Sequence, residues 1–157
     1  MPGLYYATAM RAAWFENYTV TQRLIHVDSD PASVKRDSAR LVETQNTLEK
    51  LLNDYGSTIF RAADRDLFND FKQQHALYLP AQATLLNVLP TSKDDAARIF
   101  NAQITPIWET GRLSMRKLVD NNKGYADEAA DRIRSSVEAT RVVLIVTLMI
   151  AAAVAAM

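Results

Sequence analysis

Polar and aromatic side chains recur at helical spacing in two segments of the sequence. Steps of three and four residues place such side chains on one face of a helix. The later series is Arg98, Asn101, Thr105, Trp108 and Arg112, and the earlier one is Glu16, Thr19, Arg23 and His26. Arginine binds carboxylates through two parallel hydrogen bonds, threonine adds a hydroxyl, and an indole offers a flat apolar wall or a cation–π partner. The two faces predict a site for a small organic anion, within one subunit or across a dimer.

A second group of polar residues falls at or near the expected core seams of the helices. Burying a polar group without a hydrogen-bond partner costs on the order of 1–3 kcal/mol. Such residues therefore indicate a hydrogen-bonded network or a wet pocket, with control of helix register as the simplest alternative. The group is Arg11, Tyr18, Ser38, Gln45, Tyr78 and Gln82. Because Arg11 follows the seam, we expect it to be more buried than the other arginines.

Two prolines help to place the site. Pro80 and Pro106 both lie inside predicted helices, where proline removes an amide donor and favours a kink. A rise of ~1.5 Å per residue puts them at nearly the same height. We infer that the helices part there, although two tolerated bends without a cavity are the commoner outcome.

The ligand-binding residues predicted from these patterns come from three of the helices. For any one arginine, a solvated charge or a surface ion pair is the competing interpretation. The predicted residues are Arg11, Tyr18, Arg23, Tyr78, Arg98, Thr105 and Trp108.

The remaining chemistry is limited by what the sequence lacks. There is no cysteine and there are two histidines, so thiolate metal sites, disulfides and a Glu-x-x-His di-iron motif are excluded. No phosphate-binding loop, dinucleotide fingerprint or nucleophile elbow occurs. Basic and acidic residues balance, which leaves no footprint for nucleic acid. We expect no enzyme activity, no cofactor and no metal.

Proline and glycine divide the chain into four predicted helices, at about residues 4–28, 31–55, 59–89 and 93–141. Asp30 and Pro31 form a helix start, Gly56 and Ser57 a break, and Ser92 with Asp95 a capping pair. The heptad seam predicted for the second helix is Val34, Ser38, Leu41, Gln45, Leu48, Leu52 and Tyr55. Short turns make neighbouring helices antiparallel, which predicts an all-α, up-down-up-down four-helix bundle.

The last sixteen residues, Val142–Met157, are apolar and contain neither a charge nor a helix breaker. A membrane-spanning helix needs ~20 such residues, and this run stops where the chain stops. We therefore expect a truncated transmembrane helix that continues the fourth helix of the bundle. The predicted organisation is a bundle domain over residues 1–141 and a membrane segment over residues 142–157.

The order and spacing of residues along almost the whole chain resemble a known family. The first helix contributes Pro2, Arg11, Asn17 and Arg23; the middle helices contribute the runs 51–55 and 66–71 and Tyr78; the last contributes Ala96, Ala97, Pro106, Leu118 and Asn122. This pattern is similar to the four-helix-bundle periplasmic sensory domain of bacterial methyl-accepting chemotaxis receptors. The resemblance implies a dimer in the inner membrane with its bundle in the periplasm. It implies a ligand, here a small carboxylate or aromatic acid, that shifts the last helix and so controls chemotaxis signalling.

Two other interpretations stay open. The chain could be a helical partner-binding or structural module anchored by its tail, because Arg132, Arg134 and Arg141 would place the bundle in the cytoplasm by the positive-inside rule. Acidic residues among those arginines weaken this reading. The bundle could also be the input domain of a sensor histidine kinase, which only the downstream sequence would distinguish.

Overall fold

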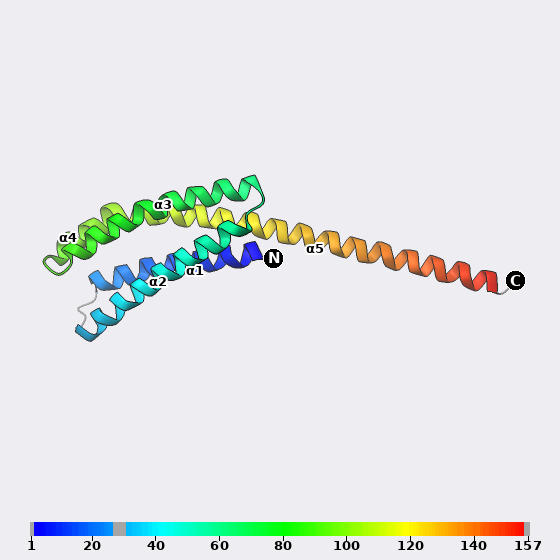
Figure 1. Cartoon of the computed structure of the whole chain (residues 1–157), viewed down its shortest axis with the longest axis horizontal. Coiled ribbons are helices and arrows are strands. Elements are labelled where there is room, and N and C mark those ends of the chain that lie inside the picture. The colour runs from blue at the N-terminus through cyan, green and yellow to red at the C-terminus, as the bar shows by residue number, and fades with distance from the viewer. Residues whose placement is uncertain (1, 27–30, 156–157) are drawn as a thin grey trace. The chain divides into compact units, whose positions relative to one another are not determined.

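The computed structural model describes residues 2–26 and 31–155, in which helices dominate and no strand occurs. The elements are α1 (Pro2–His26), α2 (Pro31–Thr58), α3 (Ala62–Val88), α4 (Lys93–Ile99), the π-helical segment η1 (Phe100–Ile104) and α5 (Thr105–Ala155) (Figure 1). Because α4, η1 and α5 follow one another without a break, the described chain has four long helical stretches. The predicted all-α fold class is confirmed.

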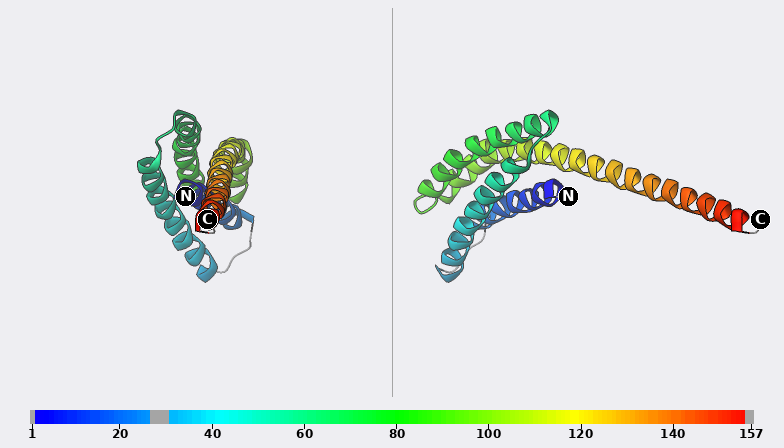
Figure 2. Two further views of the ribbon diagram at one scale, coloured as in Figure 1. Left: turned by 90° about the vertical axis from the view of Figure 1, so that its right-hand side faces the viewer. Right: turned by 45° about the vertical axis from the view of Figure 1, so that its right-hand side comes forward.

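The chain falls into two compact units, residues 1–122 and 123–157. The first unit contains α1 to α4, η1 and the part of α5 that ends at Asn122. Within it each helical stretch runs antiparallel to the one before, and α1 lies beside α2 as α3 lies beside α4 (Figures 1 and 2). This is the predicted up-down-up-down bundle. The predicted domain boundary after Arg141, drawn where charged sequence gives way to apolar sequence, stays a prediction.

Local signals explain where two of the helices begin. The Ser92 hydroxyl accepts a hydrogen bond from the backbone N–H of Asp95 at 3.1 Å, which confirms the predicted cap. Pro31 is the first residue of α2, as predicted. Its predicted cap Asp30 and the predicted end of the first helix at Asp28 lie outside the described residues.

The predicted break at Gly56 is wrong, because α2 continues through it to Thr58. Glycine in a helix interior costs ~1 kcal/mol relative to alanine, which neighbouring contacts can outweigh. Here the hydroxyls of Ser57 and Thr58 donate to the carbonyls of Asp54 and Tyr55 at 2.7 and 2.8 Å. These bonds satisfy two of the last acceptors of the helix, so the chain turns three residues later than expected.

The core is rich in aromatic residues. Contacts between polar side chains determine part of the helix register. The predicted seam of α2 fails at its start, where Val34 and Ser38 are exposed while Asp37 is buried. Asp37 pairs with Arg23 of α1, and buried Thr44 accepts a hydrogen bond from Asn17. These two contacts, and not the predicted apolar seam, determine which face of the first half of α2 is directed toward α1. The largest fully buried side chains include Trp14, Tyr55, Phe71, Tyr78 and Phe100.

Pro106 lies directly after a wider helical turn. The backbone N–H of Thr105 donates to the carbonyl of Phe100, five residues back, rather than to the residue four back. In a regular α-helix the Pro106 ring would clash with the carbonyl of Ala102, and the wider turn removes this conflict. The disturbance predicted at Pro106 therefore takes the form of a π turn, whereas Pro80 sits inside α3.

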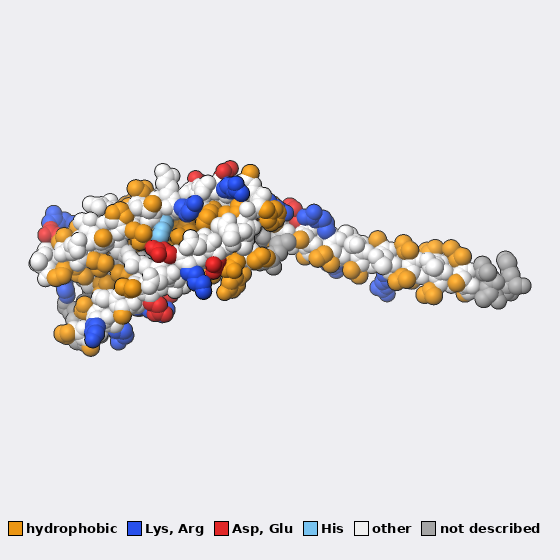
Figure 3. Space-filling model, in the orientation of Figure 1, with side chains coloured by type: hydrophobic (Ala, Val, Ile, Leu, Met, Phe, Trp, Pro, Cys, Tyr) orange, Lys and Arg blue, Asp and Glu red, His pale blue; other side chains and the backbone are white. Residues whose placement is uncertain are grey.

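The second unit is the remaining part of α5. Its side chains are exposed from Arg132 to Ala152, and from Val142 onward those whose burial is described are apolar apart from Thr147 (Figure 3). The Thr147 hydroxyl donates to the Val143 carbonyl at 2.8 Å, so this one polar side chain is satisfied within the helix. By length and composition α5 contains a stretch that could cross a membrane, and none of that stretch is buried within the structure.

Candidate ligand-binding site

Three of the predicted site residues meet where α1 packs against η1 and α5. The ring of Tyr18 stacks on Trp108, with centroids 4.1 Å apart and planes inclined by 19°, and on Phe100 at 5.0 Å. Its hydroxyl shares a hydrogen bond of 3.2 Å with the hydroxyl of Thr105. Tyr18 therefore bridges the π turn, and it fixes one face of the Trp108 indole.

Trp108 is also bonded to Trp14 of α1, in a reciprocal arrangement. The indole N–H of Trp14 donates to the backbone carbonyl of Trp108 at 3.3 Å, and the indole N–H of Trp108 donates to the carbonyl of Trp14 at 3.4 Å. Gly111 makes this close approach possible, because an added Cβ there would lie 3.0 Å from the Trp14 ring. We call this pair of bonds the tryptophan clamp.

A pocket of about 590 Å³ opens beside the tryptophan clamp, between α1 and the bundle part of α5. This volume is in the range of small-molecule sites. Both walls combine aromatic rings or small side chains with arginine. The lining residues are Thr8, Arg11, Ala12, Trp14, Phe15, Trp108, Arg112, Arg116 and Asp120. We call it the α1–α5 pocket; it contains two of the predicted residues, Arg11 and Trp108.

The charges of the α1–α5 pocket favour an anion. Three arginines face one aspartate there, and two of those arginines are already paired: Arg112 with Glu109 at 2.7 Å and Arg116 with Asp120 at 3.8 Å. The guanidinium of Arg112 also lies 5.8 Å from the Trp108 ring centroid. Arg11 makes no hydrogen bond or ion pair among the described residues. The expectation that Arg11 is buried in the seam is wrong, and its exposure is what leaves its guanidinium free for a ligand.

Tyr78 lies inside the bundle, among the predicted polar seam residues. Its ring packs against Trp14 at 4.5 Å, and its hydroxyl lies 3.4 Å from that of Thr21. Burial raises the pKa of Tyr78 well above its usual range, so the hydroxyl stays protonated. Tyr78 therefore supports the tryptophan clamp from behind and does not line the α1–α5 pocket.

Part of the polar seam forms a hydrogen-bonded network inside the bundle. The Gln82 side-chain amide donates to Asn17 at 2.8 Å and to Thr21 at 2.6 Å, and its carbonyl accepts from Gln45 at 2.6 Å. Three predicted members lie outside it: Arg11 and Ser38 are exposed, and Tyr18 bonds to Thr105 instead. Of the two alternatives for this level, the hydrogen-bonded network is the one observed.

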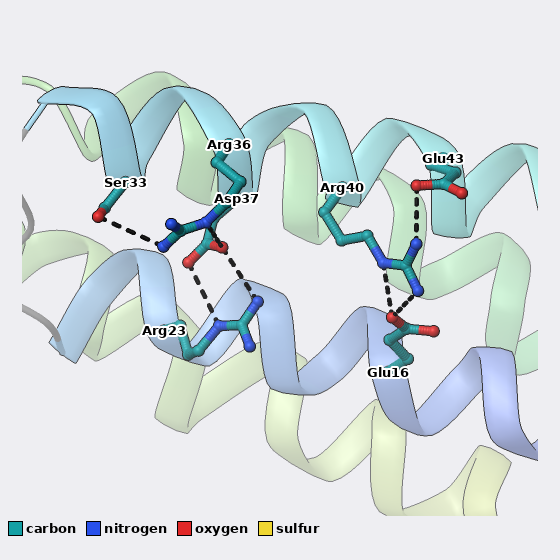
Figure 4. Close-up of polar contacts among 7 residues, drawn as sticks. All are labelled: Glu16, Arg23, Ser33, Arg36, Asp37, Arg40 and Glu43. Carbon is teal, nitrogen blue, oxygen red and sulfur yellow. Dashed lines mark hydrogen bonds and ion pairs between the residues drawn. The ribbon is translucent and has the colours of Figure 1, made fainter.

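Arg23 and Arg98 are engaged elsewhere. Arg23 donates two hydrogen bonds to Asp37 of α2, at 3.0 and 3.2 Å, in the two-pronged geometry that carboxylates favour (Figure 4). Arg98 pairs with Asp95 one turn earlier on α4. Neither arginine lines the α1–α5 pocket, and each has the carboxylate partner that the competing interpretation named.

The two prolines lie at one level, as predicted, but on the surface. Pro80 and Pro106 line a shallow groove of about 500 Å³ between α3 and the stretch formed by η1 and α5. The other lining residues are mostly apolar and small, and they carry no charge. The prolines therefore mark a surface groove rather than an opening of the core.

Sequence reasoning missed part of the α1–α5 pocket. Trp14, Phe15 and Arg116 line it but belong to neither predicted series. Thr8, Arg11 and Phe15 are spaced by three and four residues, a signal that could have found the α1 wall. Among residues 2–26 and 31–155, no group of three or more acidic or histidine side chains is placed to hold a metal ion.

Comparison with known proteins gives one match. The family described as a four helix bundle sensory module for signal transduction matches residues 2–137, which cover α1 to η1 and most of the charged part of α5. Comparisons with curated proteins and with solved structures find no match.

Proposed function

The chain belongs to the four-helix-bundle sensory modules of methyl-accepting chemotaxis proteins, and on that premise we propose that its bundle senses a small organic anion. The observation that carries the proposal is the α1–α5 pocket, where an unpaired arginine faces an aromatic wall. A carboxylate can accept two hydrogen bonds from Arg11, and an apolar or aromatic body can lie against Phe15 and Trp108. A di- or tricarboxylate could in addition draw Arg112 or Arg116 from its present partner.

In this proposal the other predicted residues either support the walls of the α1–α5 pocket or lie away from it. Tyr18 and Thr105 hold the Trp108 ring, and Tyr78 backs Trp14, so they shape the pocket without lining it. Arg23 and Arg98 are the residues that would bind if the anion entered nearer the turn between α3 and α4. Their ion pairs make this the less favourable location, since a ligand there must displace Asp37 or Asp95.

A ligand in the α1–α5 pocket contacts two helices, α1 and α5. It drives a signal only if it binds one arrangement of α1 and α5 better than another. The same helix α5 carries the apolar stretch that could cross a membrane. We propose that the shift passes along α5 through the inner membrane, with the bundle on the periplasmic side.

We propose further that two copies pair through α1. Its outer face carries Tyr5 and Phe15, which are 67% and 58% exposed, with Thr8 and Ala12 between them. These four residues are spaced by three and four positions, as in a helix-pairing seam. Three of them also line the α1–α5 pocket, so a second copy would border the ligand.

Calorimetric titration of the full chain in detergent with benzoate and with succinate tests the site. We expect binding of at least one anion, and a loss of about tenfold or more in affinity for Arg11→Ala, because a hydrogen bond to a charged group contributes about 1.5–3 kcal/mol. Arg23→Ala and Arg98→Ala are the matched controls and should bind with unchanged affinity. Loss of binding in those two variants but not in Arg11→Ala would move the site to the far end of the bundle. If neither these acids nor amino acids bind, the proposal that the bundle senses an organic anion is wrong.

A further inference from the structure

His75 occupies an unusual position for a titratable side chain. It lies on α3 and is 8% exposed, with its ring 6.0 Å from Trp14 in an edge contact and 6.3 Å from Phe71. The imidazole makes no hydrogen bond or ion pair within the part of the chain that the structure describes. Within that part of the chain the side-chain contacts of its ring are therefore aromatic, and its nitrogens are not sealed from solvent.

The surroundings of His75 act on its protonation in two opposite directions. Burial lowers the pKa of His75 below its ordinary value of 6.5, and the negative charge of Glu49 on α2 acts in the opposite direction. Glu49 is the charged group that acts on His75 from α2. The contacts from α1 and α3 are the uncharged rings of Trp14 and Phe71. The favourable movement of a protonated His75 ring is therefore toward Glu49 and water.

The neighbour that His75 would leave is half of the tryptophan clamp. Trp14 packs against His75 in an edge arrangement and donates its indole N–H to the carbonyl of Trp108 on α5. The charged ring is better hydrated and closer to an opposite charge when it turns toward Glu49 and water, since the rings of Trp14 and Phe71 offer it no hydrogen-bond acceptor. When it turns toward Glu49, Trp14 loses one of the surfaces that hold its indole against α5.

We propose that the bundle also senses protons, with His75 as the receptor group and the tryptophan clamp as the element that carries the change to α5. Acidification to the mildly acidic range charges His75, draws it from Trp14 toward Glu49, and loosens the two bonds between Trp14 and Trp108. This function is independent of the anion: it uses the α3 contact of Trp14 and needs no ligand in the α1–α5 pocket.

The test reads the two indole N–H signals of the full chain in detergent micelles by nitrogen–proton correlation NMR, from about pH 8 to about pH 5. The chain contains two tryptophans, so each signal reports one partner of the clamp. We expect both signals to move with one common midpoint below 6.5. The midpoint should fall further in Glu49→Gln and stay unchanged in Glu43→Gln, which removes a carboxylate of α2 that is paired with Arg40 instead.

His75→Gln should abolish the transition while leaving the indole signals at their high-pH positions. If that variant does not fold, the pH dependence of the His75 ring-proton signals in the unmodified chain tests the same proposal. A His75 ring that titrates while both indole signals stay still would overturn the proposed coupling. A ring that remains neutral down to about pH 5, or a transition that persists in His75→Gln, would overturn His75 as the receptor group.

Discussion

At the scale of single residues, the tryptophan clamp is the contact on which the candidate site depends. A backbone carbonyl has two lone pairs, so the carbonyls of Trp14 and Trp108 can accept an indole bond in addition to a helical one. The indoles reach those carbonyls only because the two helices approach closely at Gly111. The rings of Phe71 and Tyr78 close the other side of Trp14, at 5.2 and 4.5 Å.

Gly111→Ala tests this close approach. The new Cβ would lie 3.0 Å from Cζ2 and 3.2 Å from Nε1 of Trp14, and the packed rings behind Trp14 leave it no room to retreat. Overpacking of this kind costs about 1–3 kcal/mol, which we expect to exceed the ~1 kcal/mol that alanine contributes as the better helix former. Urea unfolding followed by circular dichroism should therefore show a lower free energy of unfolding.

Gly124 provides the matched control on the same helix. An added Cβ there meets no atom within 4 Å, so Gly124→Ala should stabilise α5 by about 0.5–1 kcal/mol. Equal effects of the two substitutions would show that the indole does not lie tightly against Gly111.

At the scale of elements, α1, α2 and α3 are joined by one buried amide. Gln82 is fully buried and bonds to Asn17 and Thr21 of α1 and to Gln45 of α2. Asn17 continues the network to Thr44 at 3.2 Å. Because each partner has a defined donor or acceptor, the network holds the three helices in one register. An apolar layer could slide more easily.

Gln82→Leu should destabilise the bundle by about 2–4 kcal/mol. Leucine fills the space, but Asn17, Gln45 and Thr21 each lose a partner, and an unsatisfied buried polar group costs about 1–3 kcal/mol. Gln73→Leu is the control, since Gln73 is exposed on the same helix and its replacement should change stability by less than about 0.5 kcal/mol. Similar urea midpoints for the two variants would mean that the network contributes little.

The elements could be predicted from sequence because local chemistry determines them. Ser92 caps α4 through its own hydroxyl, and the proline and glycine positions predict four helices in the observed order. The predictions were wrong where residues far apart in the sequence determine the local structure. Asp37 lies on the buried side of α2 because Arg23 binds it from α1. The helix α2 continues through Gly56 because no contact among the described residues forces the chain to turn there. Pro106 predicts a kink, and the structure has a π turn before it instead. Both relieve the clash between the proline ring and the carbonyl four residues earlier.

The candidate site was predicted only in part, for a similar reason. Tyr18, Thr105 and Trp108 were found because helical spacing puts residues of one helix on a shared face. The tryptophan clamp joins residues 94 positions apart and depends on the absence of a side chain at Gly111, so no pattern within one helix reveals it. The ion pair that occupies Arg23 is likewise visible only once α2 lies beside α1, whereas the pair of Arg98 with Asp95 is local to α4 and follows from their spacing of three residues.

At the scale of the whole molecule, one helix carries both a wall of the α1–α5 pocket and the apolar stretch. Trp108, Arg112 and Arg116 lie on the part of α5 that belongs to the bundle, and the uncharged apolar run begins at Val142 of the same helix. Continuous helical hydrogen bonding makes such an element stiff along its axis. A small displacement caused at Trp108 would therefore be delivered along α5 rather than absorbed in a loop.

A single cysteine on α1 tests the proposed arrangement of the receptor in its membrane. The chain contains no cysteine, so Ala12→Cys in a full-length receptor expressed in bacteria carries the only thiol in the present segment. If two copies pair through the outer face of α1 and the bundle lies in the oxidising periplasm, the thiols should form a disulfide between copies. After reduction, a membrane-impermeant maleimide should label them in intact spheroplasts.

Val42→Cys is the control for this experiment, because Val42 is 56% exposed on α2, away from the proposed pairing face. It should be labelled from outside as readily as Ala12→Cys and should give no cross-linked dimer. Labelling of both positions only after the membrane is permeabilised would place the bundle in the cytoplasm, as the arginines near the apolar stretch suggest by the positive-inside rule. Cross-linking through Val42→Cys but not Ala12→Cys would leave the apolar face of α1 without its proposed partner. It would assign the contact between copies to α2.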